Sequence, residues 1–192
     1  MADFINVFIS DIVLVFKKNN KNKLIFIGIL LLSIIFAMVK LFAFGVTEEE
    51  YSSLLLIRFI KNEVSFWFFL ILNLLRIAFT VLVIFISIYN DFTAKLIFLP
   101  ILLIVTSIFF EIACAVRFMF LIGIIPSLIW LIVSVIIALG LFVLAIDLLN
   151  NGSRWCYGRL NTIKHCKILL PILFFISLAL VVGSIILNIV II

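Results

Sequence analysis

The residues best placed to do chemistry are Arg76 and Glu111, because each ionisable side chain falls inside a long apolar stretch. A charge near the centre of a membrane helix costs about 2.5–3.5 kcal/mol on insertion scales, so each needs a partner or a function. At 1.5 Å per residue, counting from the outer ends of their stretches places Arg76 about 15 Å deep and Glu111 about 11 Å deep. These similar depths predict an ion pair. Asn73 and Cys114 lie one helical turn from Arg76 and Glu111, on the same buried faces.

Two interpretations of this polar group stay open. It could bind a substrate group, relay a proton or open a water-filled path, or it could be a structural ion pair that fixes helix register. No second acidic residue or histidine lies nearby in the sequence, so the structural role is favoured. Lys40 and Arg117 lie near the outer ends of their stretches, where their side chains can reach lipid headgroups.

The other candidate groups are Cys156, His165 and Cys166. Their spacing matches no zinc pattern and a fourth ligand is missing. Neighbouring helical residues point about 100° apart, so His165 is poorly placed to activate Cys166 as a nucleophile. The chain also has no phosphate-binding glycine loop, HExxH or GxSxG motif. We therefore expect no enzyme and no metal or other cofactor; an intramembrane enzyme using Glu111 or Cys114 is the least favoured alternative.

The elements that must position these residues are five apolar stretches, each long enough to cross about 30 Å of hydrocarbon as a helix. They cover residues 24–45, 66–89, 96–118, 126–147 and 168–190. Hydrophobic residues make up 68% of the 192 positions and charged residues only 12%, so no soluble domain is expected. The sequence predicts an all-α polytopic membrane helix bundle over 1–192 as a single domain. In residues 1–16, polar residues recur at helical spacing and apolar residues fill the opposite side, which predicts an amphipathic helix lying on the membrane surface.

Basic residues set the predicted topology. Four lysines between 17 and 23 place the N-terminus in the cytoplasm, and four further basic residues mark 148–167 as an inner loop. The loop at 46–65 is then outside, as is the C-terminus of this multi-pass cell (plasma) membrane protein. Bilayer headgroups explain the net charge of +5, so no nucleic-acid partner is expected.

Aromatic residues agree with this topology. Tyr51, Trp67 and Trp130 fall near the predicted outer interface, where aromatic anchors gather. Asp147 is interpreted as a helix-end residue at the inner interface. Among small residues at four-residue spacing, which permit close helix contact, is the pair Ser33 and Ala37.

The loops carry further signals. Thr47 and Glu50 form a capping-box pattern for a helix in the outer loop, whose apolar residues between 54 and 60 are expected to pack on the bilayer surface. Gly123 and Pro126 predict a tight turn between the third and fourth stretches. A re-entrant hairpin over 96–125 remains an alternative, but the simple hairpin gives two full-length helices.

The inner loop combines basic and aromatic residues, namely Arg154, Trp155, Tyr157 and Arg159. Headgroup anchoring is the favoured interpretation. Docking of a cytoplasmic ATPase is the alternative.

The run from Leu72 to Ala78, with Asn73, Arg76 and Ala78 in an Asn-x-x-Arg-x-Ala order, resembles the stage II sporulation protein M-like membrane family. The order of spans and the acidic outer loop are also similar to that family. Where the family has Pro-His-Gly and a following Glu, this chain has Pro126-Ser127-Leu128-Ile129-Trp130, so no role of that His or Glu transfers. Divergent relatives occur in circular bacteriocin gene clusters, beside ATPases and small immunity proteins.

The resemblance implies a non-enzymatic accessory subunit for peptide maturation, export or immunity. Its partners would be the bilayer, a cytoplasmic ATPase or another membrane subunit, and a peptide substrate. The alternative is a substrate-binding membrane component of a small-molecule transporter, similar in size to energy-coupling-factor substrate-binding subunits. Those usually have six spans, so a transmembrane 4–16 segment would favour this second function.

Overall fold

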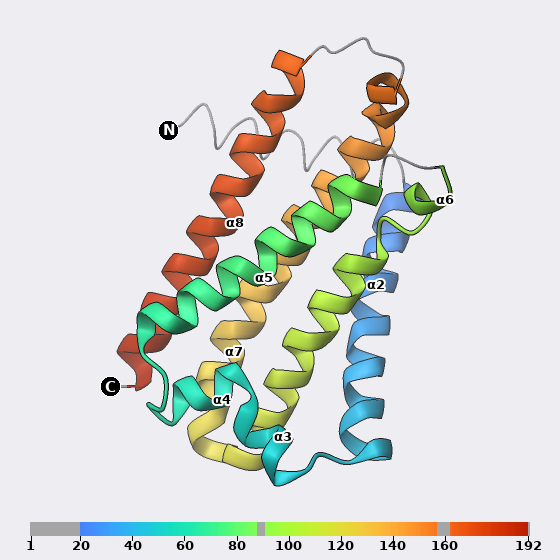
Figure 1. The fold of residues 1–192 in the computed structure, drawn as a ribbon. Helices are drawn as coiled ribbons and strands as arrows, with labels where there is room; N and C mark the ends of the chain where they lie inside the picture. The colour runs from blue at the N-terminus through green and yellow to red at the C-terminus, as the bar shows by residue number, and fades with distance from the viewer. Residues whose placement is uncertain (1–19, 88–90, 157–161, 192) are drawn as a thin grey trace.

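The computed structural model describes residues 20–87, 91–156 and 162–191 as an all-α bundle (Figure 1). The interfacial helix predicted over 1–16 lies outside these residues. The elements in order are α2 (Asn20–Val39), the π-helix η1 (Lys40–Phe44), α3 (Glu48–Ser53), α4 (Leu55–Ile60), α5 (Phe66–Ser87), α6 (Asp91–Ala94), α7 (Leu99–Cys156) and α8 (Thr162–Ile191).

Five segments are long and apolar enough to cross a membrane, as the sequence predicts. They are Asn20–Phe44, Phe66–Ser87, Phe92–Met119, Ile122–Leu149 and Ile172–Ile191. The first and third begin before the predicted starts, in flanking segments that contain polar residues, and the fourth extends at both ends through further apolar residues. The chain is thus a multi-pass membrane protein.

Although helix geometry runs from Leu99 to Cys156, α7 reverses direction and forms two antiparallel arms (Figure 1). A Cβ placed on Gly123 would lie only 2.4 Å from the carbonyl oxygen of Ala115, eight residues earlier. Such an approach is possible only because the chain turns back there and glycine has no side chain. Pro126 follows near the start of the second arm, where its missing N–H costs least. The simple hairpin is confirmed over the re-entrant alternative.

The second arm of α7 is the most deeply buried span and packs against α8. Glycines bring the two helices together: a Cβ on Gly183 would lie 2.2 Å from Val133 Cγ2, and one on Gly140 would lie 2.6 Å from Ile176 Cγ1. On the other side, α2 packs along α7, with Ser33 Oγ donating to the Leu102 carbonyl at 3.4 Å. Small residues thus form the closest contacts, as expected where lipid competes with apolar packing.

The connection between α2 and α5 differs from the prediction. It contains two short helices instead of one, although Thr47 caps the first by accepting from the Glu50 N–H at 3.2 Å. The predicted bilayer contact of the apolar segment is wrong. Leu55, Ile57 and Phe59 on α4 are buried because this helix packs against α5 and α7.

Two further interpretations are corrected. Trp130 is only 1% exposed, so it is a core residue and not an interfacial anchor. Asp147 does not end a helix, because α7 continues to Cys156.

Figure 1 places the N-terminal end of α2 and α6 at one end of the bundle, and α3, α4 and the C-terminal end of α8 at the other. We call the latter the α3/α4 end. This is the alternation that the five-span prediction requires.

Candidate functional site

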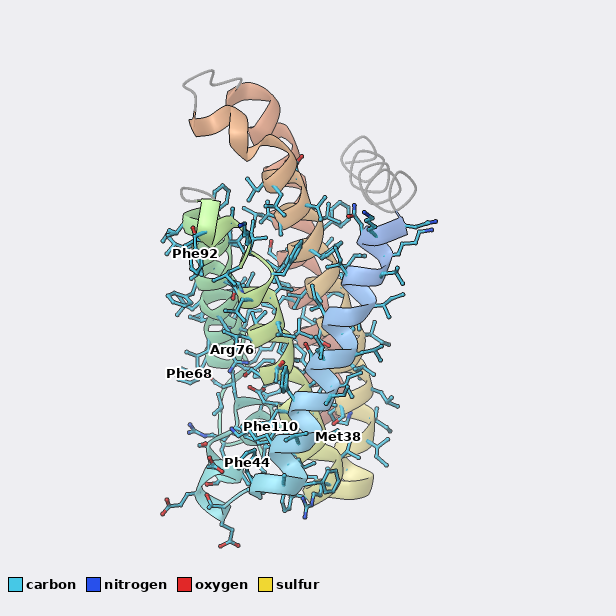
Figure 2. All side chains as sticks on the ribbon, turned by 90° about the vertical axis from the view of Figure 1, so that its right-hand side faces the viewer. Met38, Phe44, Phe68, Arg76, Phe92 and Phe110 are labelled. Carbon is cyan, nitrogen blue, oxygen red and sulfur yellow. The ribbon has the colours of Figure 1, made fainter. Side chains whose placement is uncertain are left out.

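Arg76 and Glu111 meet between α5 and the first arm of α7, with Arg76 Nη1 2.9 Å from Glu111 Oε1. The ion pair expected from residue depth is present. Arg76 lies at mid-height of the bundle (Figure 2), ten residues into a helix of 22. Its helix packs on α7, which brings the two side chains to the same level.

The two partners differ sharply in burial. The Glu111 side chain is 3% exposed, whereas that of Arg76 is 32% exposed. Glu111 Oε2 is buried and has no hydrogen-bond partner among the described residues. The Leu56 backbone N–H on α4 faces this carboxylate without reaching hydrogen-bond geometry at Oε2. The carboxylate charge therefore depends chiefly on a single guanidinium.

Arg76 also has N–H donors that the ion pair does not use. A guanidinium carries five N–H donors, and the Glu111 contact uses one nitrogen. Thr80 Oγ1 donates to the Arg76 backbone carbonyl at 2.9 Å. The Arg76 side chain is 32% exposed and is therefore accessible from outside the bundle at membrane depth.

Asn73, the third predicted member of this polar group, is buried but turns to its own helix. Its Nδ2 donates to the Phe69 carbonyl at 3.0 Å. The Phe69 ring in turn contacts Trp130, with centroids 5.0 Å apart. Asn73 thus supports the packing beside the ion pair, and its amide group donates to its own helix and not to Glu111.

Sequence reasoning missed Ser127 and Trp130 as members of the polar interior. The Ser127 hydroxyl and the Trp130 Nε1 are buried without a partner among the described residues. A buried Trp normally bonds its N–H. The only sequence signal for this polar interior was the presence of a Trp, and a Trp at this depth is equally typical of an interfacial anchor.

The outward side of α5 carries a continuous row of large apolar side chains, which we call the α5 stripe. It consists of Phe68, Ile71, Leu75, Phe79, Leu82 and Ile86, all exposed. They recur every three or four residues, the spacing of a helix–helix seam. Arg76 stands beside this stripe, between Leu75 and Phe79 in sequence.

The basic residues near the α3/α4 end are held by the protein itself. Lys40 Nζ lies 4.2 Å from the centroid of the Phe110 ring, a cation–π contact. Arg117 Nη1 donates to the Leu41 carbonyl at 3.0 Å. Leu41 lies in η1, where the wider π turn leaves backbone carbonyls to be satisfied by other donors. The sequence predicted headgroup contact for Lys40 and Arg117 and did not predict these contacts within the protein.

Tyr51 on α3 packs at the same α3/α4 end of the bundle. Its ring contacts Phe118 at 4.6 Å, and Lys61 Nζ lies 5.0 Å above it. Partial burial, with smaller contributions from Cys114 and Glu63, raises the pKa of Tyr51 above its ordinary value of 10.0.

The predicted docking residues cannot be placed. Arg154 and Trp155 belong to the last turn of α7 with side chains outside the description, and Tyr157 and Arg159 lie outside the described residues. The side chains of Cys156, His165 and Cys166 are likewise not described. Within the described part of the chain, no three potential metal-ligating side chains come together. Cys114 is a buried free thiol.

The chain matches no protein-family model, no curated protein and no solved structure.

Proposed function

We propose that this chain is a non-enzymatic accessory subunit of a bacterial peptide maturation, export or immunity system. In this proposal it binds a second membrane subunit through the α5 stripe. The observation that carries the proposal is the position of Arg76, about one third exposed at the middle of a membrane-spanning helix.

Hydrocarbon offers no acceptor for the N–H donors that Arg76 does not use in the Glu111 ion pair. Unsatisfied polar groups at that depth cost several kcal/mol, and neighbouring helices normally cover them. A partner helix laid along the stripe would pack its side chains between Leu75, Phe79 and Leu82. A carboxylate, hydroxyl or amide on that partner, facing Arg76, would accept the remaining N–H donors.

The peptide-related role follows from the resemblance to sporulation protein M-like proteins. Asn73, Arg76 and Ala78 carry that resemblance and lie in the same segment of α5 as the stripe. In this proposal Arg154, Trp155, Tyr157 and Arg159 face the cytoplasm and dock an ATPase that supplies energy.

Photocrosslinking in the native host tests the membrane interface. A photoreactive phenylalanine at position 79 should crosslink to one membrane protein. The same residue at position 36, which is exposed on α2 away from the stripe, is the matched control and should give lipid adducts only. Identical lipid adducts at both positions would contradict the proposed interface.

Gene deletion tests the peptide role. Loss of the gene should abolish either release of a mature antimicrobial peptide or the resistance of the producing cells to it, both measured by growth inhibition. An Arg154→Glu/Arg159→Glu variant should lose copurification with the ATPase. If peptide release and resistance are both unchanged by deletion, the peptide role is wrong even where the crosslink stands.

The alternative function is a substrate-binding component of a small-molecule transporter. The observation that favours it is the set of buried polar atoms on α7 that have no partner among the described residues, namely Thr106 Oγ1, Glu111 Oε2, Ser127 Oγ and Trp130 Nε1. Buried polar groups left open are the usual contacts of a bound ligand. A small molecule retained by the purified wild-type protein, and lost from a Trp130→Phe variant, would support this function over the first.

A further inference from the structure

A half-open apolar groove of about 340 Å³ lies between α2 and the first arm of α7, toward the α3/α4 end. Its volume falls within the range of about 300–1,000 Å³ typical of ligand pockets. Met38 and Phe110, labelled in Figure 2, mark this level of the bundle. The groove is on a different helix pair from the α5 stripe.

Small side chains make the space. Ala37 on α2 and Ala113 on α7 both line the groove, where larger residues would fill it. The remaining lining residues are apolar with a single exception, Arg117. The groove is therefore an apolar channel bordered by one positively charged residue.

The two cations at this end contact a backbone carbonyl and aromatic rings and not carboxylates. Arg117 donates one nitrogen to the Leu41 carbonyl, and its guanidinium carbon lies 5.2 Å from the Phe42 ring centroid. Lys40, adjacent to Leu41, adds a second positive charge near the same end. Within the described ranges, neither cation has a carboxylate within ion-pair distance, although three exposed glutamates begin α3 nearby.

We infer that this groove binds one anionic phospholipid of the leaflet at the α3/α4 end. An acyl chain occupies the channel beside Ala37 and Ala113, and the phosphate accepts from the free nitrogens of Arg117. Arg is well suited to phosphate because its planar fork can donate two parallel bonds. The same pairing of an apolar channel and a cation would not select a zwitterionic lipid, whose headgroup carries its own positive charge.

The binding experiment uses the purified full-length chain in neutral detergent, titrated with phosphatidylglycerol or with phosphatidylcholine of identical acyl chains. Native mass spectrometry counts the lipids retained. We expect one phosphatidylglycerol to be retained about tenfold more strongly than phosphatidylcholine, because the choline group would bring a positive charge close to Arg117 and Lys40. Equal retention of the two lipids would overturn the inference.

Variants separate the two halves of the site. Arg117→Gln keeps a donor for the Leu41 carbonyl but removes the charge, so the two lipids should be retained about equally. Arg117→Lys keeps the charge and should retain part of the preference for phosphatidylglycerol. Ala113→Leu fills the channel and should weaken retention of both lipids. Lys61→Gln is the matched control, because Lys61 is a cation at the same end but does not line the groove.

Circular dichroism and size-exclusion chromatography check that each variant is folded. Three results would overturn the inference: an unchanged preference in folded Arg117→Gln, competition by glycerol phosphate without acyl chains, or a change in oligomeric state on Ala113→Leu in place of lipid loss. The second would assign the site to a free anion, and the third to another copy of the chain.

Discussion

Removing either half of the Arg76–Glu111 ion pair should destabilise the bundle more than the interaction alone is worth. At the observed 2.9 Å and an effective dielectric constant of about 20, two unit charges attract by about 6 kcal/mol. Desolvation of Glu111 offsets much of this attraction, so we expect a coupling energy of about 2–3 kcal/mol.

The two single variants should differ. Arg76→Leu leaves a carboxylate that is 3% exposed without its main partner, and should cost about 3–5 kcal/mol. Glu111→Leu leaves an arginine whose long side chain is 32% exposed and can reorient toward the membrane surface, so the loss of stability should be smaller. The double variant should be more stable than Arg76→Leu alone, because no buried charge remains unpaired.

The assay is unfolding by sodium dodecyl sulfate in mixed micelles, followed by tryptophan fluorescence, since Trp130 is packed in the core. Arg58→Leu is the control. Its ion pair with Glu63 spans 3.8 Å with both side chains more than 40% exposed, so the loss should stay below about 1 kcal/mol. If the double variant loses the sum of the two single losses, the charges are not coupled and the reasoning fails.

Three further predictions follow from contacts elsewhere in the bundle. Gly183→Ala should lower the thermal unfolding temperature in detergent, at a cost of about 1–3 kcal/mol from overpacking against Val133, and Val133→Ala should restore it; no rescue would mean that α8 does not approach α7 there. Thr47→Ala should cost about 0.5–2 kcal/mol through loss of the cap on α3. Faster amide hydrogen exchange confined to α3 would report this loss, and uniform exchange would contradict it. Tyr51 should titrate above pH 10.0, as measured by phenolate absorbance against a Tyr51→Phe reference. Because its folded pKa is raised, its contribution to stability is complete below pH 10 and is lost as pH rises through the folded value; titration at or below 10 would show that the ring is not shielded.

Much of the fold could be predicted because membrane depth is a one-dimensional quantity. Counting residues along a helix places Arg76 and Glu111 at the same level, and a charge at that level requires compensation. The hairpin within α7 was also predictable from Gly123, although only the structure shows the contact with Ala115 that makes glycine necessary.

The rotation of each helix about its axis was harder to predict. In α7 nearly every residue is apolar, so no polar face distinguishes the core side from the lipid side. Trp130 and the α4 residues Leu55 and Ile57 were therefore assigned to the membrane surface, although they are buried. The burial of Ser127 and the partial exposure of Arg76 likewise depend on how α7 and α5 are rotated about their axes, which the sequence does not define.

The reversal between the arms of α7 bears on how the chain enters the bilayer. Residues 119–125 contain no charged side chain, and Gly123 draws the arms together within a few residues. Carrying such a segment across hydrocarbon is favourable, because aliphatic and aromatic residues partition into it spontaneously. The two arms can therefore enter during biosynthesis as one preformed unit, with no need for a basic flanking residue to orient the turn.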